Sequence, residues 1–156
     1  MSFLFLEDLS VGDLFESRSV NISAEEIKAF AAEYDPQPFH LDEDLAAGSY
    51  FSGLSASGWH VGSITMRLLT ESLPIGGGVI GGGVDVRWLS ATRPGDRLRT
   101  ITEIKAVEPS KSKLDRGKVT IFTKTLNQSD EIRQTIESTL LVFKKNIPDV
   151  ATWQGS

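Results

Sequence analysis

GWHVGSITMRLLTESL, residues 58–73, is the longest stretch of this chain with the periodicity of an α-helix. Apolar or small side chains recur at intervals of three and four residues along one stripe, and Pro74 ends the pattern. The stripe consists of Val61, Ile64, Thr65, Leu68, Leu69 and Ser72. Trp59 and Met66 widen the apolar arc, so we expect this helix to be buried on most of its sides.

Four stretches after this helix have the composition and alternation of β-strands. They are residues 84–91, 97–107, 118–126 and 131–143, with turns at residues 92–96 and 127–130. The alternation is clearest in the second stretch, where one face carries Leu98, Thr100, Thr102 and Ile104. Because short turns separate these strands, we expect them to form an antiparallel sheet that wraps the long helix.

The segment before the long helix begins with strand signals and continues with helix signals. A first strand is predicted over residues 14–22. Ser23 and Glu26 then form a capping box that begins a helix, and Pro36 ends it. One buried face of this helix is predicted from the spacing of Ile27, Phe30, Ala31 and Tyr34. A short helix over residues 42–47 follows.

The length and composition of the chain fit one globular domain. Of its 156 residues, 40% are apolar and 24% are charged. Together with the order of elements, these values predict a single α+β domain over residues 1–156. We expect its core to span about residues 10–145 and the C-terminal tail to be irregular.

The charge balance and the absence of cysteine argue against several classes of protein. Lys and Arg total 16 against 21 Asp and Glu, and the basic residues are scattered, so we expect no nucleic-acid partner. Without cysteine there is neither a disulfide framework nor thiolate chemistry. The beginning of the sequence lacks the basic region of a signal peptide, and no run of about 18 apolar residues suits a membrane span. We therefore expect a cytoplasmic protein with no membrane partner.

YDPQPFH, residues 34–40, carries the strongest chemical signal in the chain. Asp35 and His40 flank a pair of prolines that fix the backbone between them. His40 is one of only two histidines, and His and Asp are usual groups for proton transfer near neutral pH. We expect a rigid bend that aims both side chains at one water molecule. The alternative is that Asp35 caps a turn and His40 is a hydrogen-bonded surface residue.

ASGWH, residues 56–60, opens the long helix and suits the binding of a developing negative charge. The first N–H groups of a helix have no partner within it, and Gly58 permits close approach to the backbone. A thioester oxygen that becomes an enolate fits such a place. The alternative is that Ser57 simply caps the helix. We expect His60 to be structural or to line a pocket.

Two other patterns predict no binding site. GGGVIG, residues 76–81, has the spacing of a dinucleotide-binding motif but follows a helix and enters a strand, the reverse of the required order. We expect a flexible loop there. Two histidines and no cysteine give no recognisable set of metal ligands, so we expect no metal site.

The stretch from Phe30 to His40, a helix that ends in Asp-x-x-Pro-x-His, resembles the signature of the MaoC-like acyl dehydratases, a family that contains the (R)-specific enoyl-CoA hydratases. Residues 57–60 are similar to the opening of that family's central helix. Residues 86–96 are similar to its next strand and turn. The resemblance covers about residues 10–145 and implies a hot-dog fold, in which an antiparallel sheet wraps a long helix, and a homodimer.

Carried over residue by residue, the resemblance implies that Asp35 and His40 are the catalytic pair and that the Gly58 amide is the oxyanion hole. The implied reaction adds water to a trans-2-enoyl-CoA to give the (R)-3-hydroxyacyl-CoA, or runs in reverse. CoA is then part of the acyl-CoA substrate, and no cofactor is expected. The implied substrate-binding residues are Ser57, Trp59, Ser63 and Met66.

Three positions depart from the family's pattern. Gln37 stands where the family often has Asn, and Ser57 stands where it often has His. Met66 occupies the register of a serine that assists further along the helix, and Ser63 is the nearest hydroxyl. The acid–base pair is intact, whereas the acyl chain that the pocket accepts does not follow from the resemblance.

Two other functions are compatible with the sequence. A hot-dog thioesterase more often carries its carboxylate on or beside the central helix, where Glu71 is the single acid. A non-catalytic acyl-binding or assembly module would keep the fold without a shared water site. Contact with the phosphates of CoA would need cations, and the candidates by position are Arg87, Arg93 and Lys111.

Overall fold

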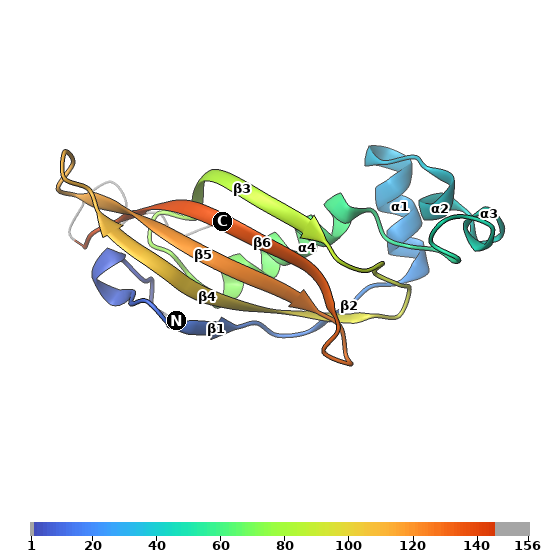
Figure 1. Ribbon diagram of the computed structural model, residues 1–156, viewed down its shortest axis with the longest axis horizontal. Coiled ribbons are helices and arrows are strands. Elements are labelled where there is room, and N and C mark those ends of the chain that lie inside the picture. Colours follow the sequence, from blue (N-terminus) through green and yellow to red (C-terminus); the bar gives the residue numbers. More distant parts are fainter. Residues whose placement is uncertain (1, 146–156) are drawn as a thin grey trace.

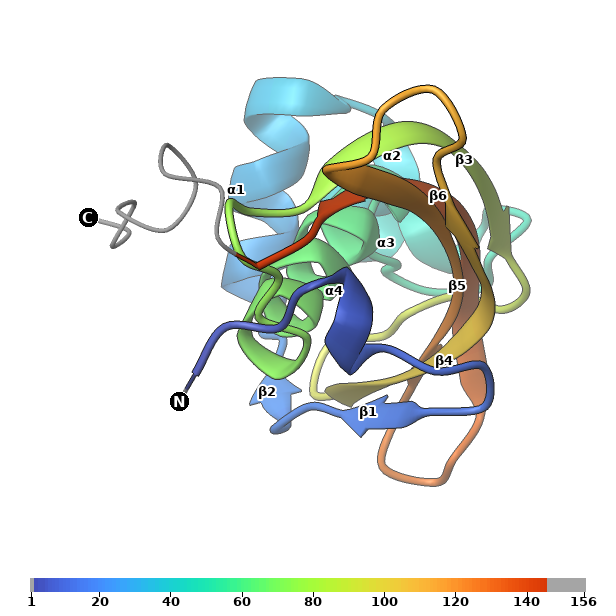
Figure 2. The same ribbon diagram turned by 90° about the vertical axis from the view of Figure 1, so that its left-hand side faces the viewer.

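A curved sheet wraps one long helix in the computed structural model, which describes residues 2–145. Helix α4 (Gly58–Ser72) lies along the concave side of the sheet (Figures 1 and 2). The strands pair antiparallel in the order β1-β4-β5-β6-β3, and β2 also pairs with β4. Their bounds are β1 (Leu14–Glu16), β2 (Val20–Asn21), β3 (Ile80–Trp88), β4 (Arg97–Pro109), β5 (Arg116–Leu126) and β6 (Ile132–Phe143). The predicted α+β hot-dog fold, with an antiparallel sheet around a helix, is confirmed.

The first predicted strand, residues 14–22, is broken into β1 and β2. Glu16 pairs with Ile101 of β4, whereas Val20 pairs with Leu98, so one extra residue is accommodated between the two short strands. Ser17 fills the break, because its hydroxyl accepts a hydrogen bond of 2.8 Å from the N–H of Thr100. The alternation of apolar residues does not predict that a side-chain hydroxyl will replace a backbone carbonyl as the hydrogen-bond acceptor at this point of the sheet.

Strand β3 begins and ends earlier than the predicted strand over residues 84–91. Its backbone already pairs with β6 at Ile80 and Gly81, across a register shift before Gly83. The end of the GGGVIG segment is therefore strand instead of a flexible loop. A run of glycines can pair in this way because strands pair through backbone groups alone. The run has no alternating side chains from which a strand could be predicted.

Two clusters of buried side chains form the core along α4. One packs the C-terminal half of the helix, through Leu69 and Leu73, against strand residues such as Ile121. The other packs Val61, near the start of the helix, against Ile27 and residues of the neighbouring loops. The second cluster fixes the start of α4 to the shorter helices beside it.

Helix α4 is buried on one face instead of on most sides. The side of the helix that faces the sheet is buried, as its predicted stripe requires. However, Trp59 is 62% exposed and Met66 is 44% exposed. The single sheet covers only one side of the helix, so the apolar arc that these residues add lies at the surface of this chain.

Three short helices lie at one end of the sheet, beside the start of α4 (Figure 1). They are α1 (Ala24–Tyr34), α2 (Pro38–Leu41) and α3 (Glu43–Ala47). Ser23 caps α1 by accepting from the N–H of Glu26, which confirms the predicted start. Ile27 and Ala31 are buried, but Tyr34 is exposed, so the predicted buried face is shorter by one turn.

The N-terminal segment adds to the core before residue 10. The 3-10 helix η1 (Leu6–Asp8) buries Leu6, and Leu4 forms a parallel bridge with Ile75. The predicted irregular tail, residues 146–156, lies outside the described residues. Within residues 2–145, no helix is long and apolar enough to cross a membrane.

Candidate active site

A cavity of about 630 Å³ lies at the N-terminal end of α4, next to α2. Its rim includes Tyr50 and Trp59, both exposed, so the cavity opens to solvent. Its wall includes Asp35, His40 and Gly58. The cavity therefore collects, in one space, the acid, the imidazole and the helix start that the sequence predicted as a site.

Asp35 and His40 lie side by side in this cavity. Asp35 is the C-cap of α1, and His40 lies in the single turn of α2. Nε2 of His40 is 3.3 Å from Oδ2 of Asp35. The sequence predicted only a rigid bend, whereas the chain re-enters a helix at Pro38, because proline suits a first helical turn and has no N–H to leave unpaired. His40 is buried, which excludes the alternative of a surface histidine.

The orientation of the His40 ring is fixed by a backbone carbonyl. Nδ1 of His40 lies 2.7 Å from the carbonyl oxygen of Ser55. Since a carbonyl can only accept, Nδ1 carries a hydrogen, and Nε2 of the neutral ring has a free lone pair. That lone pair faces the Asp35 carboxylate. Two acceptors at 3.3 Å are stable only with a proton between them, so the pair can hold and pass a proton.

The surroundings of Asp35 keep it ionised. Burial alone would raise the pKa of its carboxyl, but hydrogen bonds from Ser57 and Gln37, together with the charge that His40 carries when it is protonated, lower it. The bond from Nε2 of Gln37 to Oδ1 of Asp35 is 2.6 Å long. Asp35 is therefore a carboxylate near neutral pH, and its other oxygen is left to face His40.

Gly58 is the first residue of α4, and its N–H has no hydrogen-bond partner among residues 2–145. A free N–H at the start of a helix suits the binding of negative charge. The absence of a side chain also has a structural cause that the sequence did not indicate. A Cβ at this position would lie 2.3 Å from Cε2 of Trp88, so the glycine makes room for the indole.

Trp88 links the start of α4 to a chain of buried polar groups. Its Nε1 lies 3.1 Å from the Gly58 carbonyl and 2.8 Å from Oε1 of Gln134. Nε2 of Gln134 donates to Thr65, whose hydroxyl pairs with that of Thr125. Gly58 and Thr65 belong to α4, whereas Trp88, Gln134 and Thr125 belong to three different strands. These hydrogen bonds therefore fix the first half of the helix relative to β3, β5 and β6.

The four predicted substrate-binding residues divide into two pairs. Ser57 is fully buried, accepts from the N–H of Trp59 and donates towards Asp35, so it both caps the helix and contacts the acid. Trp59 lines the cavity. Ser63 and Met66 do not line it: Ser63 donates to the Trp59 carbonyl, and Met66 lies on the outer side of α4. Within this single chain they do not reach the acid–base pair.

Of the two roles expected for His60, structural or pocket-lining, its packing supports the structural one, because it does not line the cavity. Its ring stacks on Phe30 with 4.6 Å between centroids. Burial lowers the pKa of His60 and outweighs the opposing charge of Glu26. Its Nδ1 is buried without a hydrogen-bond partner among the described residues.

The three cations suggested for the phosphates of CoA differ in availability. Arg87 lies on the edge strand β3 and pairs with Asp85 at 3.2 Å. Lys111 lies in the loop between β4 and β5, at the end of the sheet opposite α1, α2 and α3 (Figure 1). Arg93 lines the cavity, but its guanidinium donates to backbone carbonyls of residues 51–54. None of the three therefore forms a ready phosphate site in this chain.

The glycine-rich segment and the ionisable residues show no second site of the kinds considered from the sequence. Gly77 and Gly78 adopt positive φ angles of 83° and 90°, which form the turn that leads into β3. Gly76 packs against the ring of Phe5, where a Cβ would not fit. Within residues 2–145, no group of three or more His, Asp or Glu side chains gathers closely enough to hold a metal ion.

Sequence reasoning missed two contributors to the site. The Ser55 carbonyl orients His40, but a backbone group leaves no signal in the sequence. Trp88 was assigned to a strand and not to the site. An indole three residues before the expected end of that strand could have suggested a contact with the start of the helix. Gln37 was noted only as a departure from a family pattern, and it is the hydrogen-bond donor to Asp35.

The sequence and the fold of this chain are both similar to those of known proteins. The family model described as "MaoC like domain" matches residues 10–127. The chain is 32% identical over 127 residues to the uncharacterized protein YdeM of Bacillus subtilis, which covers 80% of this chain and 89% of YdeM. A crystal structure of a MaoC-like dehydratase from Rhodospirillum rubrum superposes with a TM-score of 0.90 and 52% identity, covering 92% of this chain and 99% of that one. An (R)-hydratase from A. caviae involved in PHA biosynthesis gives a TM-score of 0.72 and 27% identity, covering 88% and 99% of the two chains.

Proposed function

Because this chain belongs to the MaoC-like dehydratase family, we propose that it is a hydro-lyase that interconverts a trans-2-enoyl-CoA and the (R)-3-hydroxyacyl-CoA. The observation that carries the proposal is the 3.3 Å approach of His40 Nε2 to Asp35 Oδ2 in a cavity that also contains Gly58. The similarity to an (R)-hydratase supports the type of reaction and its stereochemistry.

In the proposed reaction, one water molecule lies beside Asp35 and His40 and is hydrogen-bonded to both. Nε2 of His40 takes one proton as the water oxygen forms a bond to the β-carbon of the enoyl group, and the hydroxyl keeps the other proton. The proton taken up returns to the α-carbon with the help of Asp35, so the pair ends in its starting state. The reverse steps eliminate water. General acid–base catalysis by such positioned groups contributes about 10²–10⁴-fold to a rate.

Electrons move onto the thioester oxygen during this addition, and the Gly58 N–H is the proposed donor to that oxygen. The donor is held in place because Trp88 packs on the glycine and its Nε1 donates to the Gly58 carbonyl. Donors that are held before the reaction begins stabilise developing charge more than mobile ones do. CoA enters only as part of the substrate, so the proposal includes no separate cofactor.

A thioesterase is the weaker candidate for this chain. Its expected carboxylate on the central helix, Glu71, pairs with Arg18 at 2.7 Å and with Arg67 at 3.0 Å. Glu71 also lies near the C-terminal end of α4, whereas the cavity lies at the N-terminal end. A carboxylate held in this way is not available to attack a thioester beside Gly58.

A non-catalytic acyl-binding module is disfavoured by the same cavity. Such a module would tolerate a closed cavity, or an acid and an imidazole that face different regions of solvent. In this chain the cavity opens at Tyr50 and Trp59, and Asp35 and His40 face each other. The facing acid and imidazole support a reaction with water.

The proposal includes a homodimer. Strand β3 is the last strand of the sheet and pairs only with β6 among the described strands. Its exposed residues include the apolar Ile80, Val84 and Trp88. An unpaired edge with apolar side chains suits cover by a second copy. Light scattering coupled to size-exclusion chromatography measures the mass directly.

A panel of enoyl-CoA and 3-hydroxyacyl-CoA substrates, varied in chain length and branching, tests the reaction class. We expect hydration of at least one short trans-2-enoyl-CoA, with the (R)-3-hydroxy product by chiral chromatography. The same samples are assayed for free thiol. Release of CoA thiol without hydroxyacyl product would favour the thioesterase, and an (S)-product would contradict the proposed face of attack.

A further inference from the structure

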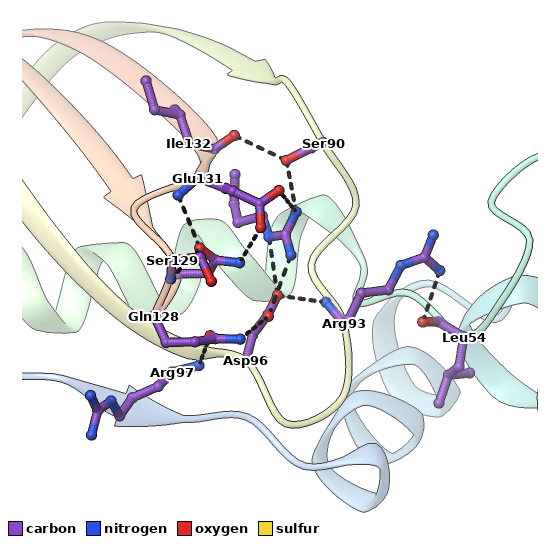
Figure 3. A network of polar contacts seen from close by, with 11 residues as sticks. Leu54, Ser90, Arg93, Asp96, Arg97, Gln128, Ser129, Glu131 and Ile132 are labelled. Atoms are coloured by element: carbon purple, nitrogen blue, oxygen red, sulfur yellow. Dashed lines mark hydrogen bonds and ion pairs between the residues drawn. The ribbon is translucent and has the colours of Figure 1, made fainter.

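Arg93, in the turn after β3, makes an unusual set of contacts with a loop that is 40 residues away in the sequence. Its Nη1 donates to the carbonyls of Gly53, at 2.9 Å, and Leu54, at 3.3 Å. Its Nη2 donates to the carbonyl of Phe51. One guanidinium therefore holds three carbonyls of the segment that leads to Ser55. Figure 3 shows the contact with Leu54.

The loop that Arg93 contacts contains two residues with positive φ angles. Ser52 adopts a φ of 53°, a left-handed conformation that is uncommon for a residue with a side chain, and Gly53 adopts a φ of 153°. These conformations turn the carbonyls of the loop towards Arg93. A Cβ at Gly53 would lie 3.2 Å from Nη1, so the loop and the guanidinium are closely packed.

The residue at the end of this loop fixes the His40 ring. The Ser55 carbonyl accepts from Nδ1 of His40 at 2.7 Å, and the Ser55 N–H donates back to the Phe39 carbonyl at 3.1 Å. The position of that carbonyl therefore decides which nitrogen of His40 carries the hydrogen. If the loop relaxes, the ring loses the contact that leaves Nε2 free to accept a proton.

Arg93 is itself anchored from behind. Its backbone N–H donates to Oδ2 of Asp96 at 2.9 Å, and the same oxygen lies 3.0 Å from Nε of Arg133 (Figure 3). Asp96 and Arg133 are both buried. The network thus extends from a buried ion pair beside β6, through Arg93, to the loop that ends at Ser55.

We propose that Arg93 is a positioning residue, which holds the 51–55 loop so that the Ser55 carbonyl keeps His40 with its hydrogen on Nδ1 and its Nε2 free. The proposal rests on the function proposed above, because Nε2 is the base in that reaction. It assigns Arg93 a role other than binding the phosphates of CoA, since its Nη1 and Nη2 both already donate to carbonyls.

Two variants of Arg93 and one control test this role. Arg93→Met keeps much of the side-chain length and removes every donor, and Arg93→Lys keeps the charge without the fork that reaches three carbonyls. Arg97→Met is the control, because Arg97 is an exposed arginine four residues away whose backbone N–H, and not its guanidinium, contacts Gln128. Circular dichroism and thermal unfolding show which variants are folded.

The first readout separates kcat from KM with the enoyl-CoA substrate. We expect Arg93→Met to lower kcat by about 10²-fold, the effect of misplacing a reacting group, with KM nearly unchanged. Arg93→Lys should fall between Arg93→Met and the wild type, and Arg97→Met should match the wild type. A raised KM with unchanged kcat would instead show that Arg93 binds substrate, and would overturn the proposal.

The second readout does not depend on activity. Two-bond ¹H–¹⁵N correlation spectra of the neutral rings report which nitrogen of each histidine carries hydrogen, and the chain has only two histidines. We expect His40 to be protonated on Nδ1 in the wild type and to become a mixture in Arg93→Met. An unchanged Nδ1 signal in folded Arg93→Met overturns the proposal. If the wild type hydrates no substrate, the proposed function fails, while this spectrum still decides the role of Arg93. If Arg93→Met does not fold, Arg93→Lys is judged by both readouts.

Discussion

The side-chain amide of Gln37 donates a hydrogen bond of 2.6 Å to Oδ1 of Asp35, two residues earlier in the chain. Pro36 and Pro38 surround Gln37, so its backbone has little freedom to withdraw from the acid. The amide thereby occupies one carboxylate oxygen and leaves the other oxygen facing His40. Together with the hydrogen bond from Ser57, this contact explains how a carboxyl that is partly buried can remain ionised.

Replacement of Gln37 by Leu should shift the acid limb of activity. Burial raises the pKa of Asp35 and the Gln37 bond lowers it, so loss of the bond should move that pKa upwards. Asp35 then protonates at a higher pH, and the acid limb of kcat/KM moves to higher pH. Near neutral pH the loss should stay well below the roughly 10²–10⁴-fold typical of removing an acid–base group. A pH profile measures this, with the exposed change Glu25→Gln as control, and an unmoved acid limb would count against the contact.

Gly58→Ala should destabilise the protein through Trp88. The added Cβ would lie 2.3 Å from the indole, so the ring or the helix start must move. Overpacking of this kind costs about 1–3 kcal/mol. The double variant Gly58→Ala/Trp88→Ala removes the clash, so its cost should be smaller than the sum of the two single changes. Urea denaturation of the four proteins measures the coupling, and additive costs would show that the two residues do not clash.

Asp96→Ala should be more damaging than most surface changes. Asp96 pairs with Arg133 at 3.0 Å, and the two side chains are 4% and 10% exposed. Removing one partner of a buried pair leaves an uncompensated charge and costs about 3–5 kcal/mol. Glu103→Ala, which breaks the half-exposed pair with Lys105, is the matched control and should cost about 1 kcal/mol or less. Equal losses in the two variants would mean that the Asp96 network is not structural.

His60 should make the protein less stable in mild acid. Burial lowers its pKa in the folded protein below the ordinary value of 6.5, so the unfolded chain binds more protons below that pH. Stability from this group is therefore complete above about pH 6.5 and falls as the pH falls below it. His60→Phe keeps the stacking on Phe30 without a titrating group. The wild type should lose more stability than the variant between pH 7 and pH 5 in denaturant titrations, and parallel losses would contradict this.

The sequence was sufficient for those parts of the structure that side-chain patterns encode. The alternation of Leu98, Thr100, Thr102 and Ile104 gave β4, and the cap at Ser23 gave the start of α1. The prolines around Gln37 correctly placed Asp35 and His40 together. Each of these signals lies within a few consecutive residues, so it can be detected in the sequence alone.

The remaining features depend on contacts between distant segments. The register change after Glu16 arises where the Ser17 hydroxyl enters the ladder of β4. The contact of Trp88 with Gly58 joins residues that are 30 positions apart. Met66 has the spacing of a core residue but lies beyond the area that one sheet covers. No short stretch of sequence predicts these features, because each depends on which distant segments come into contact in the folded chain.

The central claim is that Asp35 and His40 act together on one water molecule. The most direct test is the initial rate of hydration of a short trans-2-enoyl-CoA by the wild type, Asp35→Asn and His40→Gln, followed through the ultraviolet absorbance of the enoyl thioester. Circular dichroism confirms that the variants are folded. We predict that each single variant loses at least about 10²-fold in kcat, and that the double variant is hardly slower than either. Full activity in either folded variant would contradict the account.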